Sequence, residues 1–276
     1  MNLFYAPDIQ QSLSLPEEES QHCIKVLRMK SGDHIHIIDG VGGLYEAQII
    51  EAHPKRTQVE ILTHQTEYGR RPFRLHLAVA PTKNIDRFEW FVEKATEIGF
   101  DELTPLCCRY SERKIIKPER IEKILVSAAK QSLKAYVPIL NPMTIFKEFI
   151  SQYSPPVLGG TDERSKSRGC LHTMPCKEKV AEGNAEGGEG SQLSTLNSQL
   201  FIAHCHNQPK QHLFNACQPG GNVVVMVGPE GDFSEEEVEL ALRNSFQAIS
   251  LGESRLRTET AGVVACHLVT VANHAK

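Results

Sequence analysis

Two turns near the C-terminus carry more ionisable side chains than ordinary loop connections need. The first, Gly-Pro-Glu-Gly at 228–231, follows the apolar run 223–227, and the second follows the run 249–251. The ionisable residues are Glu230 on the first turn and Arg255, Arg257 and Glu259 on the second. Carboxylates can accept protons, and guanidinium groups can stabilise developing negative charge. Because open α/β sheets bind ligands at the carboxyl ends of parallel strands, the two turns predict a ligand site.

The elements that would position these turns alternate between strands and helices from residue 71 onward, which predicts an α/β domain with a parallel sheet. Strands are expected at 75–80, 103–106, 156–158, 200–204, 223–227 and 248–251. Helices are expected at 85–99 and from 118 to about 135, and Ser234 with Glu237 forms a capping box for another. The stretch 162–199 has few apolar residues, which predicts a disordered insertion.

Residues 1–70 read as a separate small β domain. Strand patterns cover 34–39, 45–50 and 57–62, with a short helix predicted at 22–28. Several short strands in so few residues favour a small barrel.

Composition points to a cytoplasmic protein. The chain has 276 residues, 40% of them hydrophobic, with a net charge of −4. No apolar run approaches the roughly 20 residues of a membrane span, and the N-terminus shows no secretory signal. The eight cysteines form no Cys-x-x-Cys pair, so we expect reduced thiols. Cys170, His172 and Cys176 are too few for structural zinc, and no metal site is predicted.

Charge is distributed unevenly along the chain. The segment 109–134 has eight basic and three acidic residues. Such a stripe can follow RNA phosphates even on an acidic protein, although a solvated helix face is the alternative interpretation.

Three further motifs accompany the two turns: Ala-Pro-Thr-Lys at 80–83, Lys-Ala-Thr-Glu-Ile-Gly at 94–99 and Pro-Leu-Cys-Cys-Arg-Tyr-Ser-Glu-Arg at 105–113. Together they resemble the RsmE-type 16S ribosomal RNA (uracil-1498-N3)-methyltransferases of the SPOUT class, over nearly the whole chain except 162–199. The resemblance implies a PUA-like β-barrel over 1–70 and a SPOUT domain with a deep C-terminal trefoil knot over 71–276. It also implies a homodimer, S-adenosylmethionine as cofactor, and 16S rRNA in the small ribosomal subunit as substrate.

The resemblance also implies roles for individual residues. The cofactor would bind His204, Val227, Gly228, Pro229, Glu230, Gly231, Leu251, Gly252, Leu256, Arg257 and Thr258. RNA would bind Arg28, Lys83, Arg109, Arg113, Lys114, Lys130 and Lys134. Arg257 and Arg113 are candidates for stabilising a deprotonated uracil, and Glu230 and Glu259 for taking its N3 proton. For Glu259 the alternative is stabilisation of a helix start, and for Arg113 a phosphate or interface contact.

Two positions depart from the family pattern. Many members have a second glycine where this chain has Asp232, and a Gly-Arg pair in the segment where it has 131–136, so that Lys134 would replace the arginine. Trp90 is interpreted as a packing or dimer residue rather than a base-stacking one. Gly262, inside a predicted helix, indicates close helix packing, in one chain or across a dimer.

Other functions stay open. The same cofactor motifs fit a SPOUT methyltransferase with another RNA target. A non-catalytic RNA-binding assembly factor is a second class. A nucleotide-binding oxidoreductase is disfavoured because no Gly-x-Gly-x-x-Gly follows a strand.

Overall fold

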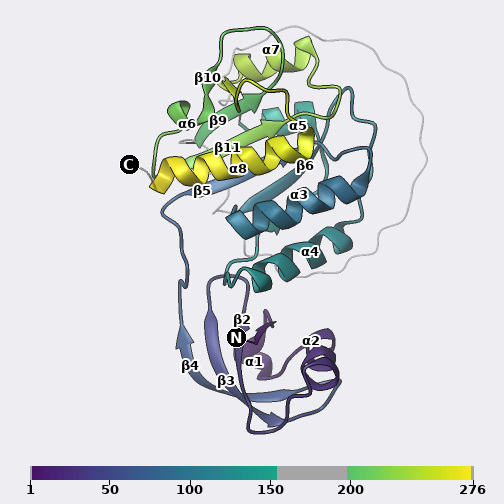
Figure 1. The fold of residues 1–276 in the computed structure, drawn as a ribbon, viewed down its shortest axis with the longest axis vertical. Coiled ribbons are helices and arrows are strands. Elements are labelled where there is room, and N and C mark those ends of the chain that lie inside the picture. Colours follow the sequence, from purple (N-terminus) through teal and green to yellow (C-terminus); the bar gives the residue numbers. More distant parts are fainter. Residues whose placement is uncertain (1, 154–197, 275–276) are drawn as a thin grey trace, which may run out of the picture.

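The computed structural model describes residues 2–153 and 198–274, and its chain forms two separate sheets (Figure 1). The first has four strands and the second eight. The first comprises β1 (Leu3–Tyr5), β2 (His34–Ile38), β3 (Leu44–Glu51) and β4 (Gln58–Gln65). The helices α1 (Ile9–Ser12) and α2 (Glu17–Gln21) and the π-helical turn η1 (His22–Val26) accompany it.

The N-terminal sheet buries alternate residues of its strands, as a sheet with one covered face requires. In β3 the buried positions are Tyr45, Ala47 and Ile49. The sheet runs β1-β2-β3-β4, and the segment around Ser14 continues it beside β4 through hydrogen bonds at Leu15 and Val59. The predicted barrel is therefore a sheet whose β4 edge is covered by this segment rather than by direct pairing with β1.

The larger sheet is parallel throughout, as predicted from the alternation of strands and helices. Its order is β10-β12-β9-β11-β5-β6-β7, with β8 also pairing with β6. Its strands are β5 (Arg74–Val79), β6 (Glu102–Cys107), β7 (Ile139–Leu140), β8 (Thr144–Ile145), β9 (Ser198–Ala203), β10 (Gln211–His212), β11 (Asn222–Val227) and β12 (Gln247–Ser250).

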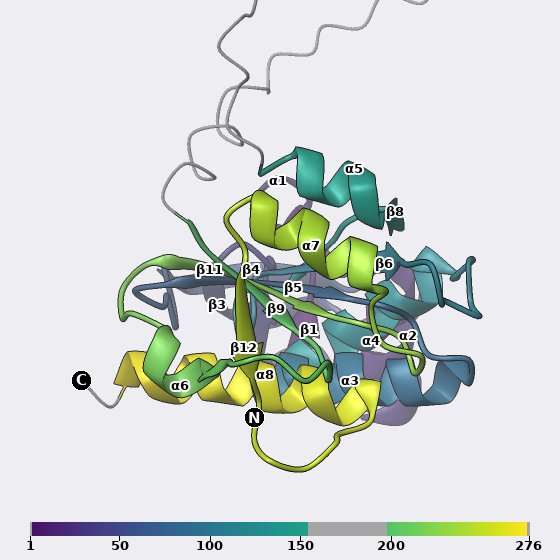
Figure 2. The same cartoon turned by 90° about the horizontal axis from the view of Figure 1, so that it is seen from above.

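Helices cover both faces of this sheet (Figure 2). One face carries α3 (Ile85–Ile98), α4 (Pro118–Gln131), α6 (Leu213–Ala216) and α8 (Thr258–His274), and the other carries α5 (Phe146–Ser151) and α7 (Glu235–Arg243). Because side chains alternate along a strand, β5 contributes to two cores: Leu75 and Leu77 pack with Phe91 of α3, whereas Ala78 packs with Phe146 of α5.

Gly262 lies where α8 packs against α3. A Cβ atom at this position would come within 2.5 Å of the Phe91 ring, so only glycine leaves room for it. The close helix packing predicted for Gly262 is thus present within one chain.

Most predicted elements are present, with differences at their ends. The helix α4 stops at Gln131 rather than near 135, because Leu133 has a left-handed backbone at φ 57°. The strand β9 begins at Ser198, two residues before the predicted strand start at 200. Residues 154–197, including the predicted strand at 156–158, lie outside the described residues.

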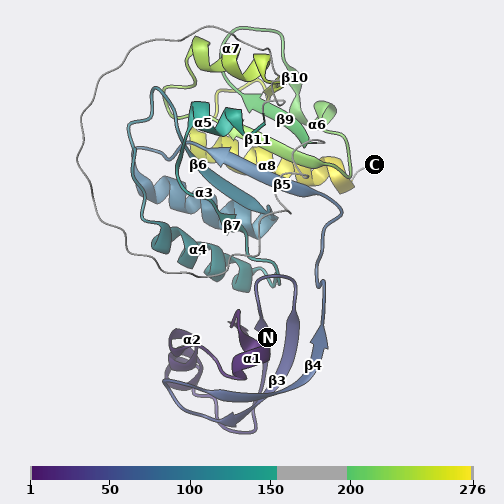
Figure 3. The ribbon, with the colours of Figure 1, turned by 180° about the vertical axis from the view of Figure 1, so that it is seen from behind.

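The N-terminal sheet lies below α4 (Figures 1 and 3). Backbone hydrogen bonds join Gly42 to Ala135 and Val137 to Gly40, and Lys130 of α4 forms an ion pair with Glu19 of α2. The α4 face that pairs with the N-terminal domain is thus part of the predicted basic stripe. None of the helices in the described ranges is long and apolar enough to cross a membrane.

Candidate active site

A cavity of about 700 Å³ opens where β9, β11 and β12 end. The strand order places these three carboxyl ends side by side, although β9 and β12 lie far apart in the sequence. The predicted cofactor residues that line the cavity are His204, Val227, Gly228, Pro229, Glu230, Leu251, Gly252, Leu256, Arg257 and Thr258. Gly231 is the one predicted cofactor residue outside this lining.

The two turns that line the cavity are joined by a side chain. The Thr258 hydroxyl, at the start of α8, donates to the Gly228 carbonyl oxygen at 3.1 Å, and Thr258 is buried. Gly252 has φ 137°, a conformation that favours glycine. A Cβ atom on Gly228 would lie 3.1 Å from the Phe233 ring. Packing and backbone conformation therefore account for both glycines.

His204 points two unused ring nitrogens into a buried environment. It follows β9, is only 6% exposed, and neither nitrogen has a hydrogen-bond partner among the described residues. Burial, reinforced by the Lys210 ammonium, lowers its pKa to about 4, so the ring is neutral near pH 7. A neutral imidazole can both donate and accept a hydrogen bond, which suits it to a polar ligand.

Asp232 holds the first turn in place. It has a left-handed backbone at φ 66°, a conformation that aspartate tolerates better than most residues and that glycine adopts without strain. Its carboxylate accepts hydrogen bonds from the amides of Cys205, at 2.7 Å, and of Phe233, at 2.8 Å. Aspartate therefore replaces glycine here by linking the β9 and β11 loops.

The two candidate proton acceptors have different surroundings. Glu259 is 7% exposed in the first turn of α8, and its Oε2 atom is buried without a hydrogen-bond partner in the described structure. Its Oε1 lies 3.9 Å from Nε of Arg87. Glu230 is exposed, and its Oε1 accepts a hydrogen bond from the Lys83 amide at 2.8 Å. Only Glu259 combines burial with an unsatisfied oxygen.

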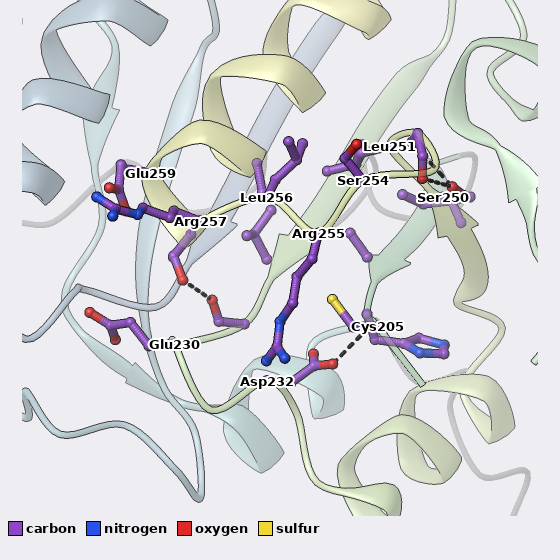
Figure 4. A pocket seen from close by; sticks show the side chains of 18 of the residues that line it. Cys205, Glu230, Asp232, Ser250, Leu251, Ser254, Arg255, Leu256, Arg257 and Glu259 are labelled. Atoms are coloured by element: carbon purple, nitrogen blue, oxygen red, sulfur yellow. Dashed lines mark hydrogen bonds between the residues drawn. The ribbon is translucent and has the colours of Figure 1, made fainter. Parts of the chain in front are cut away.

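Three of the candidate catalytic and cofactor-binding side chains gather on one side of the cavity (Figure 4). Glu230, Arg257 and Glu259 lie together there, whereas Leu251 lies on the opposite side and Arg255 reaches toward Asp232. The cavity thus has one side suited to proton transfer, and an opposite side where Leu251, beside Ser250 and Ser254, offers an apolar contact for a flat ring.

Arg113 does not line the cavity. Its guanidinium donates to the carbonyl oxygens of Thr82, at 3.1 Å, and Lys83, at 2.7 Å. These bonds fix the loop after β5, which in turn anchors Glu230. A direct catalytic role for Arg113 would require this arrangement to change, so we interpret it as a positioning residue.

Several of the predicted RNA-binding cations have partners within the protein. Lys130 pairs with Glu19, and burial lowers the pKa of Lys134, whose ammonium donates to the Glu97 carbonyl. These contacts remove the reason for assigning Lys130 and Lys134 to RNA.

The other predicted RNA-binding cations are more accessible. Arg109 pairs with Glu236 and Lys83 with Glu112 at the surface. Arg28 and Lys114 are exposed and form no ion pair within the described ranges. These two remain the freest of the predicted set.

Arg87 and Lys210 also contribute to the site, although the sequence did not single them out. Arg87 lies in the first turn of α3 and faces Glu259 across the cavity wall. The Lys210 ammonium joins the carbonyl oxygens of His204 and His206 at 2.6 and 2.8 Å. Neither residue belongs to a recognisable motif, and only the pairing of α3 with α8 brings Arg87 to the site.

Across the described residues no group of three His, Cys, Asp or Glu is arranged to hold a metal, and Cys170, His172 and Cys176 lie outside them.

Comparison with known families agrees with this geometry. A family model described as an RNA methyltransferase domain matches residues 69–181 and 189–270, and an RNA methyltransferase PUA domain matches 15–62. The chain belongs to the RNA methyltransferase family.

Relatives of this RNA methyltransferase align over almost its entire length. The probable rRNA-methyltransferase from Porphyromonas gingivalis is 35% identical, with a TM-score of 0.79 over 100% of this chain and 99% of that one. Ribosomal RNA small subunit methyltransferase E from Neisseria gonorrhoeae, solved with S-adenosyl methionine, is 26% identical, with a TM-score of 0.71 over 96% and 95%. The protein of the same name from Synechocystis is 28% identical over 95% of this chain and 75% of its own length.

Proposed function

We propose that this enzyme transfers a methyl group from S-adenosylmethionine to N3 of a uracil in 16S rRNA, the uridine at position 1498 of the small subunit. The observation that carries the proposal is the cavity formed by three strand ends, where buried polar atoms of His204 and Glu259 have no hydrogen-bond partner in the described part of the chain. The Neisseria relative binds this cofactor in a similar fold.

The residues present fit that cofactor. Leu251 and Leu256 offer apolar contacts for an adenine ring, and the unused nitrogens of His204 offer hydrogen bonds. A cavity of about 700 Å³ lies within the range typical of ligands of this size. When bound, S-adenosylmethionine supplies an electrophilic methyl group.

The chain's own residues would prepare the uracil. Uracil N3 must lose its proton before it can attack a methyl group, and we infer that Glu259 accepts that proton through its unpartnered Oε2. Arg257, on the same side of the cavity, would stabilise the negative charge on the base. Glu230 would mainly hold the loop after β5, through the Lys83 amide.

We also propose the domain division at residue 70, the deep trefoil knot and the homodimer. For the knot, the support is that the chain passes from β12 at one side of β9 back to α8, which packs against β5 and β11. For the dimer, Trp90 is 46% exposed on α3, an exposure that favours a contact surface over the core. A cytoplasmic location follows from the proposed ribosomal substrate.

The test measures methylation of small subunits from cells lacking this protein. Mass spectrometry should detect 3-methyluridine at position 1498 after incubation with the wild type and S-adenosylmethionine. Arg257→Ala should abolish the product, and Glu259→Gln should lower kcat by about 10²–10⁴-fold while cofactor affinity measured by calorimetry is kept. Glu230→Gln is the matched control and should lose less.

Each failure has a distinct meaning. Methylation at another nucleotide would indicate a different RNA target for the same site. RNA binding without measurable cofactor binding would indicate a non-catalytic assembly factor. A fully active Glu259→Gln enzyme would remove Glu259 as proton acceptor.

A further inference from the structure

The loop between β6 and α4 presents an exposed aromatic ring beside the first cavity turn. Tyr110 is 49% exposed. A Cβ atom on Gly231 would lie 3.0 Å from the Tyr110 Cβ, so the missing side chain of Gly231 makes room for this tyrosine. Gly231 was predicted to bind the cofactor, and the atom nearest to a Cβ placed on it is the Tyr110 Cβ. The turn therefore lines the cavity through residues 228–230 and contacts Tyr110 through Gly231.

The backbone around Tyr110 is held from both sides. Before it, the Arg109 amide donates to Oε1 of Glu237 at 2.8 Å, and the Cys108 amide donates to the Ser111 hydroxyl at 2.9 Å. After it, Arg113 is bonded to the loop that follows β5. A ring that is half exposed on so constrained a backbone loses little entropy when a ligand covers it.

Basic residues precede and follow Tyr110 along the chain. The Arg109 guanidinium lies 5.8 Å from the centre of the Tyr110 ring and pairs with Glu236 at the surface. Lys114 and Lys117 are exposed and form no ion pair in the part of the chain that is described, and Ile115 between them is 79% exposed. Aromatic rings bordered by cations are the usual surface for single-stranded RNA, because bases stack on the ring and phosphates contact the cations.

We propose that Tyr110 is a stacking platform for an unpaired RNA base next to the methylated uridine, with Lys114 and Lys117 contacting its phosphates. The proposal rests on the proposed function, since it places the base beside the 228–231 turn that lines the cofactor cavity. The exposed Lys114 and Lys117 favour RNA, which carries a negative charge at every phosphate, over a second copy of this chain, whose net charge is −4 over 276 residues. A ring held at this position would keep the strand in register while the target uracil enters the cavity.

The experiment compares Tyr110→Ala with Tyr110→Phe in the full-length protein. Ile115→Ala, which removes another exposed side chain of the same loop, is the control and should bind as the wild type does. Binding of a fluorescein-labelled oligouridylate of about ten nucleotides is measured by anisotropy, and KM and kcat are measured on small subunits. Tyr110→Ala should weaken oligouridylate binding by about 5- to 150-fold and raise KM, whereas Tyr110→Phe should bind as the wild type does. Cofactor affinity should not change in any variant.

Two outcomes would overturn the platform. Unchanged oligouridylate affinity in Tyr110→Ala would show that no base stacks there. A change in the oligomeric state of Tyr110→Ala relative to the wild type, measured by light scattering, would show that Tyr110 belongs to an interface between copies of the chain. Because the binding assay needs no methylation, wild-type protein that binds the oligouridylate but methylates nothing would refute the proposed function and leave the platform standing.

Discussion

Replacing Gly262 by alanine tests how closely α8 must pack on α3 to form the cavity wall. A Cβ atom at 262 would lie 2.5 Å from Cε2 and 2.7 Å from Cδ2 of Phe91. These distances are well inside van der Waals contact, and Phe91 is fully buried. The ring or the helix must therefore move, in an interior that is packed as densely as an organic crystal.

The magnitude follows from two opposing effects. Alanine stabilises a helix interior by about 1 kcal/mol relative to glycine. Overpacking a core costs about 1–3 kcal/mol. Phe91 also contacts the Phe88 ring, at 5.7 Å between centroids, so it has little space to yield and the upper part of the range applies. We expect a net loss of roughly 1–2 kcal/mol, or about 2–8 °C in Tm for a chain of this size.

The assay is thermal unfolding followed by circular dichroism, together with calorimetry of cofactor binding. Affinity should fall as well, because the collision lies between α3, which carries Arg87, and α8, which carries Glu259. The control introduces Gly262→Ala into a Phe91→Leu background, where the substitution should cost less because the ring edge is gone. An unchanged or higher Tm in the wild-type background, or an equal loss in both, would refute the packing argument.

Three further perturbations follow from the site and the domain contact. Since burial lowers the pKa of His204 to about 4, the unfolded chain binds the proton first. The free energy of unfolding should therefore fall as pH drops from about 6.5 to 4. In His204→Gln the midpoint of urea unfolding should depend less on pH over that range. Lys130→Met strands the mostly buried Glu19 carboxylate and should cost about 2–4 kcal/mol in urea unfolding, whereas Lys123→Met, at an exposed pair, should change little. Asp232 has a left-handed backbone, so Asp232→Ala should lower the free energy of unfolding by about 1–2 kcal/mol. Calorimetry should also show weaker cofactor binding, and Asp232→Asn should lose less of both.

Regular periodicity made most of the α/β domain predictable. The apolar positions of 85–98 recur at helical spacing and Gly99 ends the helix, as the structure shows at φ 122°. The capping box at Ser234 and Glu237 is present as predicted, since it depends on local residues alone. The predicted end of α4 was wrong by four residues. The helix stops early because Leu133 adopts a left-handed backbone, a conformation that a leucine in the sequence does not indicate.

Partner choice could not be read from the sequence. Lys130 and Lys134 look like RNA-binding cations in a basic stripe. In the structure Lys130 forms an ion pair with Glu19, and the Lys134 ammonium donates to the Glu97 carbonyl oxygen. Both partners come from other elements, so only the three-dimensional arrangement of α2, α3 and α4 decides which cations stay free. Local charge thus indicates where RNA could bind, and tertiary contacts decide which residues are available.

The roles of the glycines in the first turn also depend on tertiary contacts that the sequence does not show. Gly228 faces the cavity, yet its missing side chain makes room for the Phe233 ring, and Gly231 makes room for Tyr110. The resemblance implied cofactor binding for both glycines, and the structure shows that each also packs against an aromatic residue of the protein. The turn is therefore shaped by its own packing, and it both lines the cavity and contacts an exposed tyrosine. A motif of this kind locates a site reliably, but the role of each glycine in it follows from its neighbours.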